Sequence, residues 1–223
     1  MSRDPAPITH AIFDLDGTLL DTEALYTQAA MVVCRRYGTE YTLSIKRAVM
    51  GGDTFEGAAY TIGTLGLPLE PAQYVEQRER ELYALLDGVV PMAGAITLLD
   101  ALRARGIPLA VATSGHREIT MQKLAKQPFL HDLAALVCGD DERLARPKPA
   151  PDIYLLAARE LGAEPHRCLV VEDSLNGLRA ALLAGMRTVA LVDPRWGFDP
   201  RAFAAAERTV HALTEIELAH FGL

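Results

Sequence analysis

From about residue 90 onward, short apolar segments alternate with segments of helical periodicity. The apolar segments are residues 108–112, 134–138, 168–171 and 188–192. The helical patterns occupy residues 92–105, 116–126, 152–161 and 175–184, and glycine stops three of them. Near-continuous apolar strands separated by helices are typical of a parallel sheet with helices on both faces. The chain is therefore predicted to have an α/β fold.

Residues 21–87 interrupt this alternation. The apolar run Ala11–Phe13 predicts a first strand before them. Residues 23–37, 54–64 and 71–86 have helical patterns, and no convincing strand lies among them. We expect a helical insertion at residues 21–87 within a core formed by residues 1–20 and 88–223, with hinge crossings near Leu20 and Gly88.

Two carboxylates follow the first predicted strand. Asp14 and Asp16 flank one leucine directly after Phe13, so both emerge from a strand-to-loop junction. Gly17 permits a sharp turn there, because glycine adopts positive φ at little cost. Paired carboxylates at the carboxyl end of a strand suit metal binding, nucleophilic attack and acid–base chemistry.

Polar residues also lie at the ends of other predicted strands or in the loops beside them. Thr113 and Ser114 place two hydroxyl groups at the start of a helix, where free N–H groups favour anions. Lys148 lies in a loop stiffened by three prolines, which suits a lysine directed at a fixed anion. Glu172 and Asp173 end a further strand. Taken singly, each signal also fits an ordinary N-cap or a solvated side chain.

Taken together, these groups predict phosphoryl chemistry. The carboxyl ends of parallel strands meet at one edge of an open α/β sheet, where ligands bind. Four carboxylates gathered there (Asp14, Asp16, Glu172 and Asp173) would not all ionise without a cation. Hard oxygen ligands favour Mg²⁺, which also takes a substrate phosphate as a ligand.

The pattern resembles the haloacid dehalogenase superfamily over almost the whole chain. The matching motifs are Phe13-Asp14-Leu15-Asp16-Gly17-Thr18, Thr113-Ser114-Gly115, Lys148 and Glu172-Asp173-Ser174. The resemblance implies a Rossmann-like parallel sheet of strand order 5-4-1-2-3 with an inserted all-helical cap of the C1 type. Residues 8–13, 49–51 and 220–223 look like those of pseudouridine-5′-phosphatases, and β-phosphoglucomutase-like members share the core motifs.

The resemblance also implies catalytic roles. Asp14 would attack phosphorus and form an aspartyl phosphate, while Asp16 would protonate the leaving alcohol and then deprotonate water. Ser114 or Thr113 would hold phosphate oxygens. Lys148 would neutralise the charge shared by Asp14 and the phosphoryl group.

A magnesium ion is part of the same implied mechanism. Its ligands would be the Asp14 carboxylate, the Asp16 backbone carbonyl, Asp173 and a phosphate oxygen. Glu172 would lie next to the ion or support it from behind, and the sequence leaves both positions open.

Four further residues are candidate substrate contacts. Asp53 and Thr54 follow two glycines in the insertion, where a ligand can approach closely. Glu23 flanks the first hinge. His116 follows the predicted phosphate-binding loop, although a solvated histidine in the first helical turn is the simpler interpretation.

Several alternatives share parts of this pattern. A dehalogenase needs no acid at position 16. A phosphomutase of the β-phosphoglucomutase type carries a cap-hinge histidine, where this chain has Tyr26, which lacks a base near neutral pH. A phosphonatase would need a Schiff-base lysine, for which Lys46 is the candidate. A non-catalytic binding protein that keeps the fold is the alternative from another class.

Composition restricts the partners and the compartment. The 223 residues carry a formal charge of −7, which argues against a nucleic acid polymer. No apolar run approaches the roughly 20 residues that span a membrane. The amino-terminal residues lack the apolar stretch of a secretory signal. The three cysteines are odd in number and widely spaced, and Cys138 and Cys168 lie in strand-like runs where buried free thiols are expected. We therefore expect a cytoplasmic protein that binds neither a nucleic acid polymer nor a membrane. The resemblance described above implies a small phosphorylated metabolite as its partner, and we expect a monomer or weak dimer.

Overall fold

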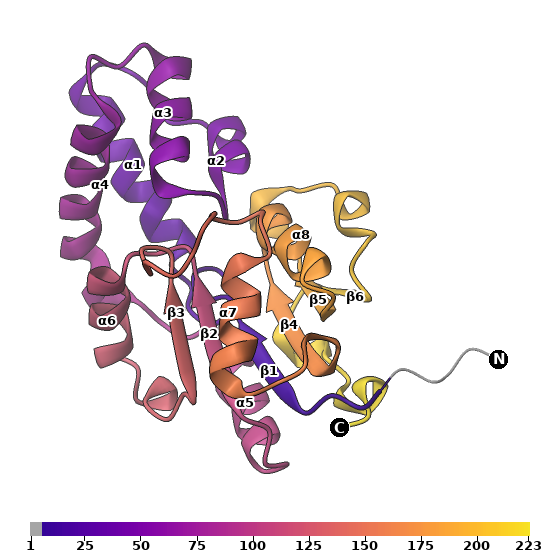
Figure 1. Cartoon of the computed structure of the whole chain (residues 1–223). Coiled ribbons are helices and arrows are strands. Elements are labelled where there is room, and N and C mark those ends of the chain that lie inside the picture. Colours follow the sequence, from indigo (N-terminus) through magenta and orange to yellow (C-terminus); the bar gives the residue numbers. More distant parts are fainter. Residues whose placement is uncertain (1–5) are drawn as a thin grey trace.

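The computed structural model describes residues 6–223, in which one parallel sheet of six strands forms the core (Figure 1). The strands are β1 (His10–Phe13), β2 (Leu109–Thr113), β3 (Ala135–Cys138), β4 (Cys168–Glu172), β5 (Arg187–Leu191) and β6 (Arg208–Val210). Their order across the sheet is β3-β2-β1-β4-β5-β6, and every neighbouring pair is parallel. The implied order 5-4-1-2-3 is confirmed, and β6 extends the sheet beside β5.

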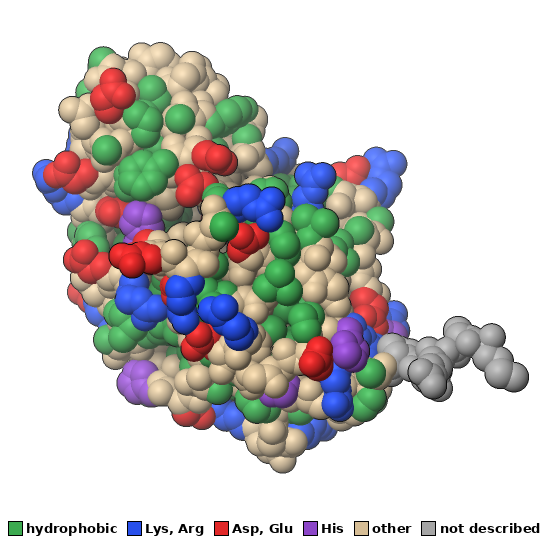
Figure 2. Space-filling model, viewed as in Figure 1, with side chains coloured by type: hydrophobic (Ala, Val, Ile, Leu, Met, Phe, Trp, Pro, Cys, Tyr) green, Lys and Arg blue, Asp and Glu red, His purple; other side chains and the backbone are tan. Residues whose placement is uncertain are grey.

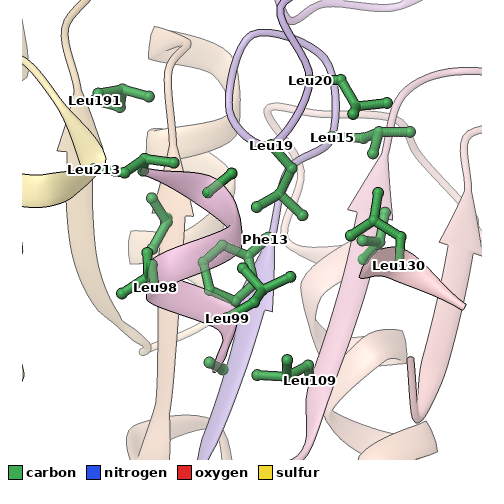
Figure 3. Close-up of a cluster of buried hydrophobic side chains, with 14 of the residues drawn as sticks. Phe13, Leu15, Leu19, Leu20, Leu98, Leu99, Leu109, Leu130, Leu191 and Leu213 are labelled. Carbon is green, nitrogen blue, oxygen red and sulfur yellow. The ribbon is translucent and has the colours of Figure 1, made fainter. Parts of the chain in front are cut away.

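Two layers of helices cover the sheet, which explains why its strands are apolar on both faces. The core helices are α5 (Ala95–Arg103), α6 (Arg117–Ala125), α7 (Asp152–Leu161) and α8 (Leu175–Leu183). Phe13 packs with Leu99 of α5 on one face, as Figure 3 shows. Its neighbour Ile12 packs with Ile153 of α7 on the other face. Each such buried side chain stabilises the fold by about 1.5–3 kcal/mol relative to exposure.

The helical insertion has a hydrophobic cluster of its own. Its helices are α1 (Glu23–Arg36), α2 (Leu43–Val49), α3 (Thr54–Leu65) and α4 (Pro71–Leu85). Val33 of α1, Ile45 of α2, Ala58 of α3 and Tyr74 of α4 are all buried in this cluster. In Figure 1 these helices stand together beyond one end of the sheet.

The two chain segments that join the insertion to the core run side by side. The Asp21 N–H donates to the Val90 carbonyl at 2.9 Å, and the Met92 N–H donates to the Leu19 carbonyl at 2.9 Å. Leu20 also forms an isolated antiparallel bridge with Pro91. Both crossings therefore lie at one place, next to the Asp14–Asp16 loop.

Short elements account for most differences from the predicted pattern. The strand β6 and the seven-residue helix α2 were not predicted, and α5 begins three residues later than expected, after Gly94 adopts a positive φ of 86°. Single turns of 3₁₀ helix lie at Leu86–Gly88, Pro128–Leu130, Pro165–Arg167, Pro194–Trp196, Pro200–Phe203, Leu213–Glu215 and Leu218–Phe221. The predicted core range starts at residue 1, and residues 1–5 lie outside the described residues.

Two expectations from composition can be compared with the structure. Cys138 and Cys168 are buried free thiols, as predicted, and so is Cys34. Among the helices of residues 6–223, none combines the length and the apolar character that a membrane crossing requires.

Candidate active site

A cleft lies between the carboxyl ends of the strands and the helical insertion. It encloses about 790 Å³ of empty space, part of which is open solvent. The core lines it with Asp14, Asp16, Thr113, Ser114 and Asp173. All four helices of the insertion, or the loops beside them, line the other side. These five predicted residues are thus brought to one cleft, whereas Glu172 and Lys148 lie behind its surface.

Asp14 is held by Lys148. The Lys148 Nζ donates to Asp14 Oδ1 at 2.6 Å, to Glu172 Oε1 at 2.6 Å and to the Ala112 carbonyl at 3.1 Å. Burial raises the pKa of Asp14 to about 7, although the Lys148 ammonium lowers it. Burial lowers the pKa of Lys148, but the charges of Asp14 and Glu172 outweigh it, so that this pKa is raised. Lys148 therefore stays cationic beside the Asp14 carboxyl group.

Both carboxylate oxygens of Glu172 already have donors. Oε1 accepts from Lys148 and from the Tyr154 hydroxyl at 2.9 Å. Oε2 accepts from the Ser174 N–H and from the Ser174 hydroxyl, each at 2.9 Å. Gly177 lies so near that a Cβ at this position would stand 1.6 Å from Oε1. Glu172 is therefore fixed in one place, with its charge directed at Lys148.

Asp16 is clamped by a lysine that the sequence did not point to. Lys123 of α6 is fully buried, and its Nζ donates to Asp16 Oδ1 at 2.6 Å and Oδ2 at 2.7 Å. The Thr22 hydroxyl donates to Asp16 Oδ1 at 2.6 Å. Lys123 Nζ also donates to the Tyr26 hydroxyl at 2.9 Å. The Asp16 carboxylate is thus fixed by α6 on one side and by the start of the insertion on the other.

Asp173 is the carboxylate of this group that has no cationic side chain against it. The Thr18 hydroxyl lies 3.4 Å from Oδ1, while Oδ2 is buried and has no hydrogen-bond partner within residues 6–223. Burial raises the pKa of Asp173 well above its usual range, and the charges of Glu172 and Asp14 add to the rise. An orphaned carboxylate oxygen beside further carboxylates is the environment that a bound cation relieves.

The donor set fits Mg²⁺ better than a metal enclosed by protein ligands. No group of three or more His, Cys, Asp or Glu side chains that could hold an ion is present in the described part of the chain. Mg²⁺ characteristically keeps several waters and binds through one or two carboxylates plus substrate phosphate. Asp14, the orphaned Asp173 and the Asp16 backbone carbonyl are consistent with that pattern.

Thr113 and Ser114 differ in their availability. The buried Thr113 hydroxyl accepts from the Gly115 N–H at 3.0 Å and lies 3.5 Å from Asp16 Oδ2. Ser114 is partly exposed and lines the cleft. Of the two hydroxyl groups, that of Ser114 is therefore the freer to meet a ligand.

The predicted substrate contacts separate into two groups. Glu23, Asp53 and Thr54 line the cleft. Glu23 is engaged in an ion pair with Lys46. Asp53 Oδ1 caps α3 by accepting from two backbone N–H groups at 2.9 Å. His116 does not line this cleft; it lies in a smaller neighbouring hollow, with its ring 6.1 Å from that of Phe55.

Several polar residues of the site were missed by sequence reasoning. Lys123 of α6 donates to the Asp16 carboxylate, and Tyr154 of α7 donates to the Glu172 carboxylate. Arg78 lines the cleft from α4. Lys123 follows the buried residues Ile119 and Thr120 by four and three positions, so all three lie on the same face of α6. That spacing is a weak sequence signal that Lys123 is buried.

Comparison with known proteins agrees with this geometry. The profile of a hydrolase family described as haloacid dehalogenase-like hydrolase matches residues 8–185. A probable pseudouridine-5′-phosphatase of Drosophila melanogaster is 37% identical over 220 residues, covering 97% of this chain and 94% of that protein. The (DL)-glycerol-3-phosphatase 2 of Arabidopsis thaliana is 32% identical over 222 residues, with coverages of 97% and 92%.

A solved structure shows the same architecture. The crystal structure of CbbY from Rhodobacter sphaeroides in complex with phosphate has a TM-score of 0.83 and 29% sequence identity to this chain. The match covers 97% of this chain and 100% of the other. The likeness therefore includes both the sheet and the helical insertion.

Proposed function

Because the chain belongs to the haloacid dehalogenase-like hydrolase family, we propose that it is a Mg²⁺-dependent phosphatase of small phosphomonoesters that acts through an aspartyl-phosphate intermediate. The observation that carries the proposal is the strand-end carboxylate Asp14, which lines the cleft and is held by buried Lys148. The similarity to phosphatases named for pseudouridine 5′-phosphate and glycerol 3-phosphate supports the substrate class.

Asp14 is the proposed nucleophile. Its Oδ1 accepts from Lys148, which leaves Oδ2 to form a bond to phosphorus while the bond between phosphorus and the leaving oxygen breaks. Lys148 offsets the negative charge that the carboxylate and the phosphoryl group share, and Glu172 keeps Lys148 in position. Both carboxylate oxygens of Glu172 already accept hydrogen bonds, which supports a role in positioning Lys148 and not direct binding of the metal.

Asp16 is the proposed general acid and base. It gives a proton to the leaving oxygen, and it takes one from the water that attacks phosphorus and releases Asp14. Lys123 and Thr22 hold its carboxylate, so its position relative to Asp14 is set before substrate arrives. The Ser114 hydroxyl is the proposed donor to the phosphate oxygens, with Thr113 in support.

The proposed metal site consists of Asp14, Asp173 and the Asp16 backbone carbonyl. When bound, Mg²⁺ supplies positive charge to the phosphate oxygens and orients them. The orphaned Asp173 Oδ2 supports this assignment, because an oxygen that binds a metal ion needs no hydrogen-bond donor from the protein.

We propose that residues 21–87 act as a cap on a core formed by residues 1–20 and 88–223. The paired crossings at Leu20 and Pro91 support a hinge there, and the separate hydrophobic cluster of the insertion supports movement as a unit. Closure of such a cap excludes water from the reaction.

Two alternative activities find less support. The Tyr26 hydroxyl accepts from Lys123 and burial raises the pKa of Tyr26, so it does not replace the hinge base of a phosphomutase. Lys46 forms an ion pair with Glu23, and although burial lowers the pKa of Lys46 to about 8, its amine is still mostly protonated near pH 7, whereas a Schiff base needs the free amine. Interspersed acidic and basic side chains on the face in Figure 2 fit a metabolite better than a polymer, and three unpaired cysteines support a cytoplasmic location.

The test is release of inorganic phosphate, with Mg²⁺ or EDTA, from pseudouridine 5′-phosphate, UMP, hexose phosphates and p-nitrophenyl phosphate. Metal-dependent release is expected, and addition of Mg²⁺ after EDTA should restore it. Release that EDTA does not affect would contradict the metal assignment. No release from any ester, together with isomerisation of a sugar phosphate, would favour the mutase.

A further inference from the structure

Arg78 places a positive charge in the wall of the cleft without an acidic partner. It projects from α4 and lines the cleft. Its Nε is buried and has no hydrogen-bond partner, and no carboxylate of residues 6–223 lies within 4.0 Å of its nitrogens. The Tyr26 ring, with its centroid 5.7 Å from the guanidinium carbon, is its one cation–π partner within that range of residues. A partly buried charge without a counter-ion costs free energy, so a counter-ion is expected from outside the chain.

The groups around Arg78 do not supply that counter-ion. Tyr41 and Tyr74 also line the cleft, and burial raises the pKa of both, so their phenols are neutral near pH 7. Lys46 is a second cation on this wall. Glu23, the buried acid of the insertion, is paired with Lys46 and is therefore not available to Arg78. Asp53 is occupied as the N-cap of α3.

The carboxylates of the core do not supply it either. Asp14 is paired with Lys148 and Asp16 with Lys123. Asp173 remains, and it belongs to the proposed metal site. The positive charge of Arg78 is therefore left for the part of the substrate that lies against the insertion, which is the leaving group.

We infer that the leaving group carries a second anionic group, a carboxylate or another phosphate, and that Arg78 binds it. The inference rests on the proposed phosphatase function and narrows its substrate class to esters other than pseudouridine 5′-phosphate and glycerol 3-phosphate, whose leaving groups are uncharged and for which two relatives are named. A planar guanidinium donates two parallel hydrogen bonds to either oxyanion. A neutral sugar or base would offer acceptor oxygens but would leave the charge of Arg78 uncompensated.

The test uses ester pairs that differ only in this second group. Glycerol 3-phosphate is compared with 3-phosphoglycerate for a carboxylate, and fructose 1-phosphate with fructose 1,6-bisphosphate for a phosphate. In the wild type, kcat/KM should be about tenfold or more higher for the anionic member of at least one pair. The pair that shows the preference tells which oxyanion is bound.

Substitution of Arg78 then links the preference to this residue. In Arg78→Met, kcat/KM for the anionic member should fall about 10- to 100-fold, and far less for its neutral counterpart. Arg78→Lys keeps the charge and should retain part of the preference. Arg80→Met is the matched control, because it removes an arginine of the same helix whose side chain is 70% exposed, and it should change neither value. An equal loss on both members of each pair, or a wild type that prefers the neutral esters, would overturn the inference.

A binding measurement separates this inference from the proposed function. In an Asp14→Asn background, calorimetry with the same ester pairs reports affinity without turnover. Tighter binding of the anionic member that Arg78→Met abolishes supports the subsite, even if the wild type hydrolyses nothing. Hydrolysis by the wild type without any such contrast in affinity refutes the subsite and leaves the phosphatase intact.

Discussion

The two walls of the cleft use charge differently. On the core wall, Asp14 and Glu172 share Lys148, Asp16 is paired with Lys123, and Asp173 has the unpartnered oxygen that suits a metal. On the wall formed by the insertion, Lys46 is paired with Glu23, the lining tyrosines are neutral, and Arg78 has no acid partner within residues 6–223.

This difference separates reaction from recognition. Groups that handle the phosphoryl transfer must be held in one geometry, because misplacement by 1 Å can cost about 100-fold in rate. A buried network of paired charges provides that rigidity. We propose that the unpaired Arg78 provides affinity instead, with its partner supplied by the substrate. On this proposal the core wall carries the chemistry, and the insertion selects which ester is accepted.

The largest effect is expected for Asp14→Asn, which keeps the size of the side chain and removes its charge. Turnover should fall by more than about 10⁴-fold for every ester, because no aspartyl phosphate forms. The loss should be the same for charged and neutral leaving groups, since the substitution leaves the wall of the insertion untouched. Phosphate release measures it, and circular dichroism checks that the fold is retained.

Full activity in Asp14→Asn would refute the nucleophile assignment. A loss confined to one class of ester would instead show that the two walls do not act separately, because a change in the core would then alter recognition.

A smaller effect is expected for Lys123→Met, which breaks the pairing of the core wall at one point. Asp16 would keep hydroxyl donors only, from Thr22 and Thr113. We expect kcat for glycerol 3-phosphate to fall about 10- to 100-fold, because its alkoxide leaving group needs a proton. For p-nitrophenyl phosphate, whose leaving group is stable as an anion, the fall should be much less. Steady-state kinetics with the two esters gives the ratio.

The control for Lys123 is Lys126→Met, because Lys126 follows α6 directly and forms an exposed ion pair with Asp87. This variant should retain both rates. Equal losses on the two esters in Lys123→Met would contradict a role in positioning the general acid and would indicate a structural role only.

The core wall was largely predictable from sequence. Its residues directly follow strands, so strand ends predicted from apolar runs also placed Asp14, Ser114 and Asp173 at one edge of a parallel sheet. The sheet order came from the family resemblance. The strand β6 could not be predicted, because it has three residues and two of them are exposed.

The wall of the insertion was much less predictable. Arg78 lies in the run Glu76–Glu81, whose alternating charges look like a solvated helix face. In the structure it falls four residues after Tyr74 and four before Leu82, on the buried face of α4, and only the packing of α4 reveals this. Lys123 was missed for the same reason. His116, predicted from its place after the phosphate loop, is not among the residues that line the cleft and lies in a neighbouring hollow.

The smallest effect is expected for Arg195→Met, at the contact between the core and the first segment that leads into the insertion. Arg195 follows β5 and donates to both carboxylate oxygens of Asp21, at 2.9 Å each, beside the first crossing. Its side chain is 46% exposed, so the ion pair is screened and contributes at most about 1 kcal/mol. We expect kcat/KM to change less than about threefold, in the same direction for all esters, as measured by steady-state kinetics.

The control for Arg195 is Arg201→Met, because Arg201 is a 90% exposed arginine paired with Asp199 in the same region of the chain. It should leave the kinetics unchanged. The contacts of the neighbouring Trp196 suggest a result that would contradict a purely structural role for Arg195. Its carbonyl accepts from Arg47 Nε at 2.6 Å, and its ring lies 5.2 Å from Lys46 Nζ. If Arg195→Met affects anionic esters more than neutral ones, the loop acts through these contacts on recognition, and the wall of the insertion includes a segment of the core.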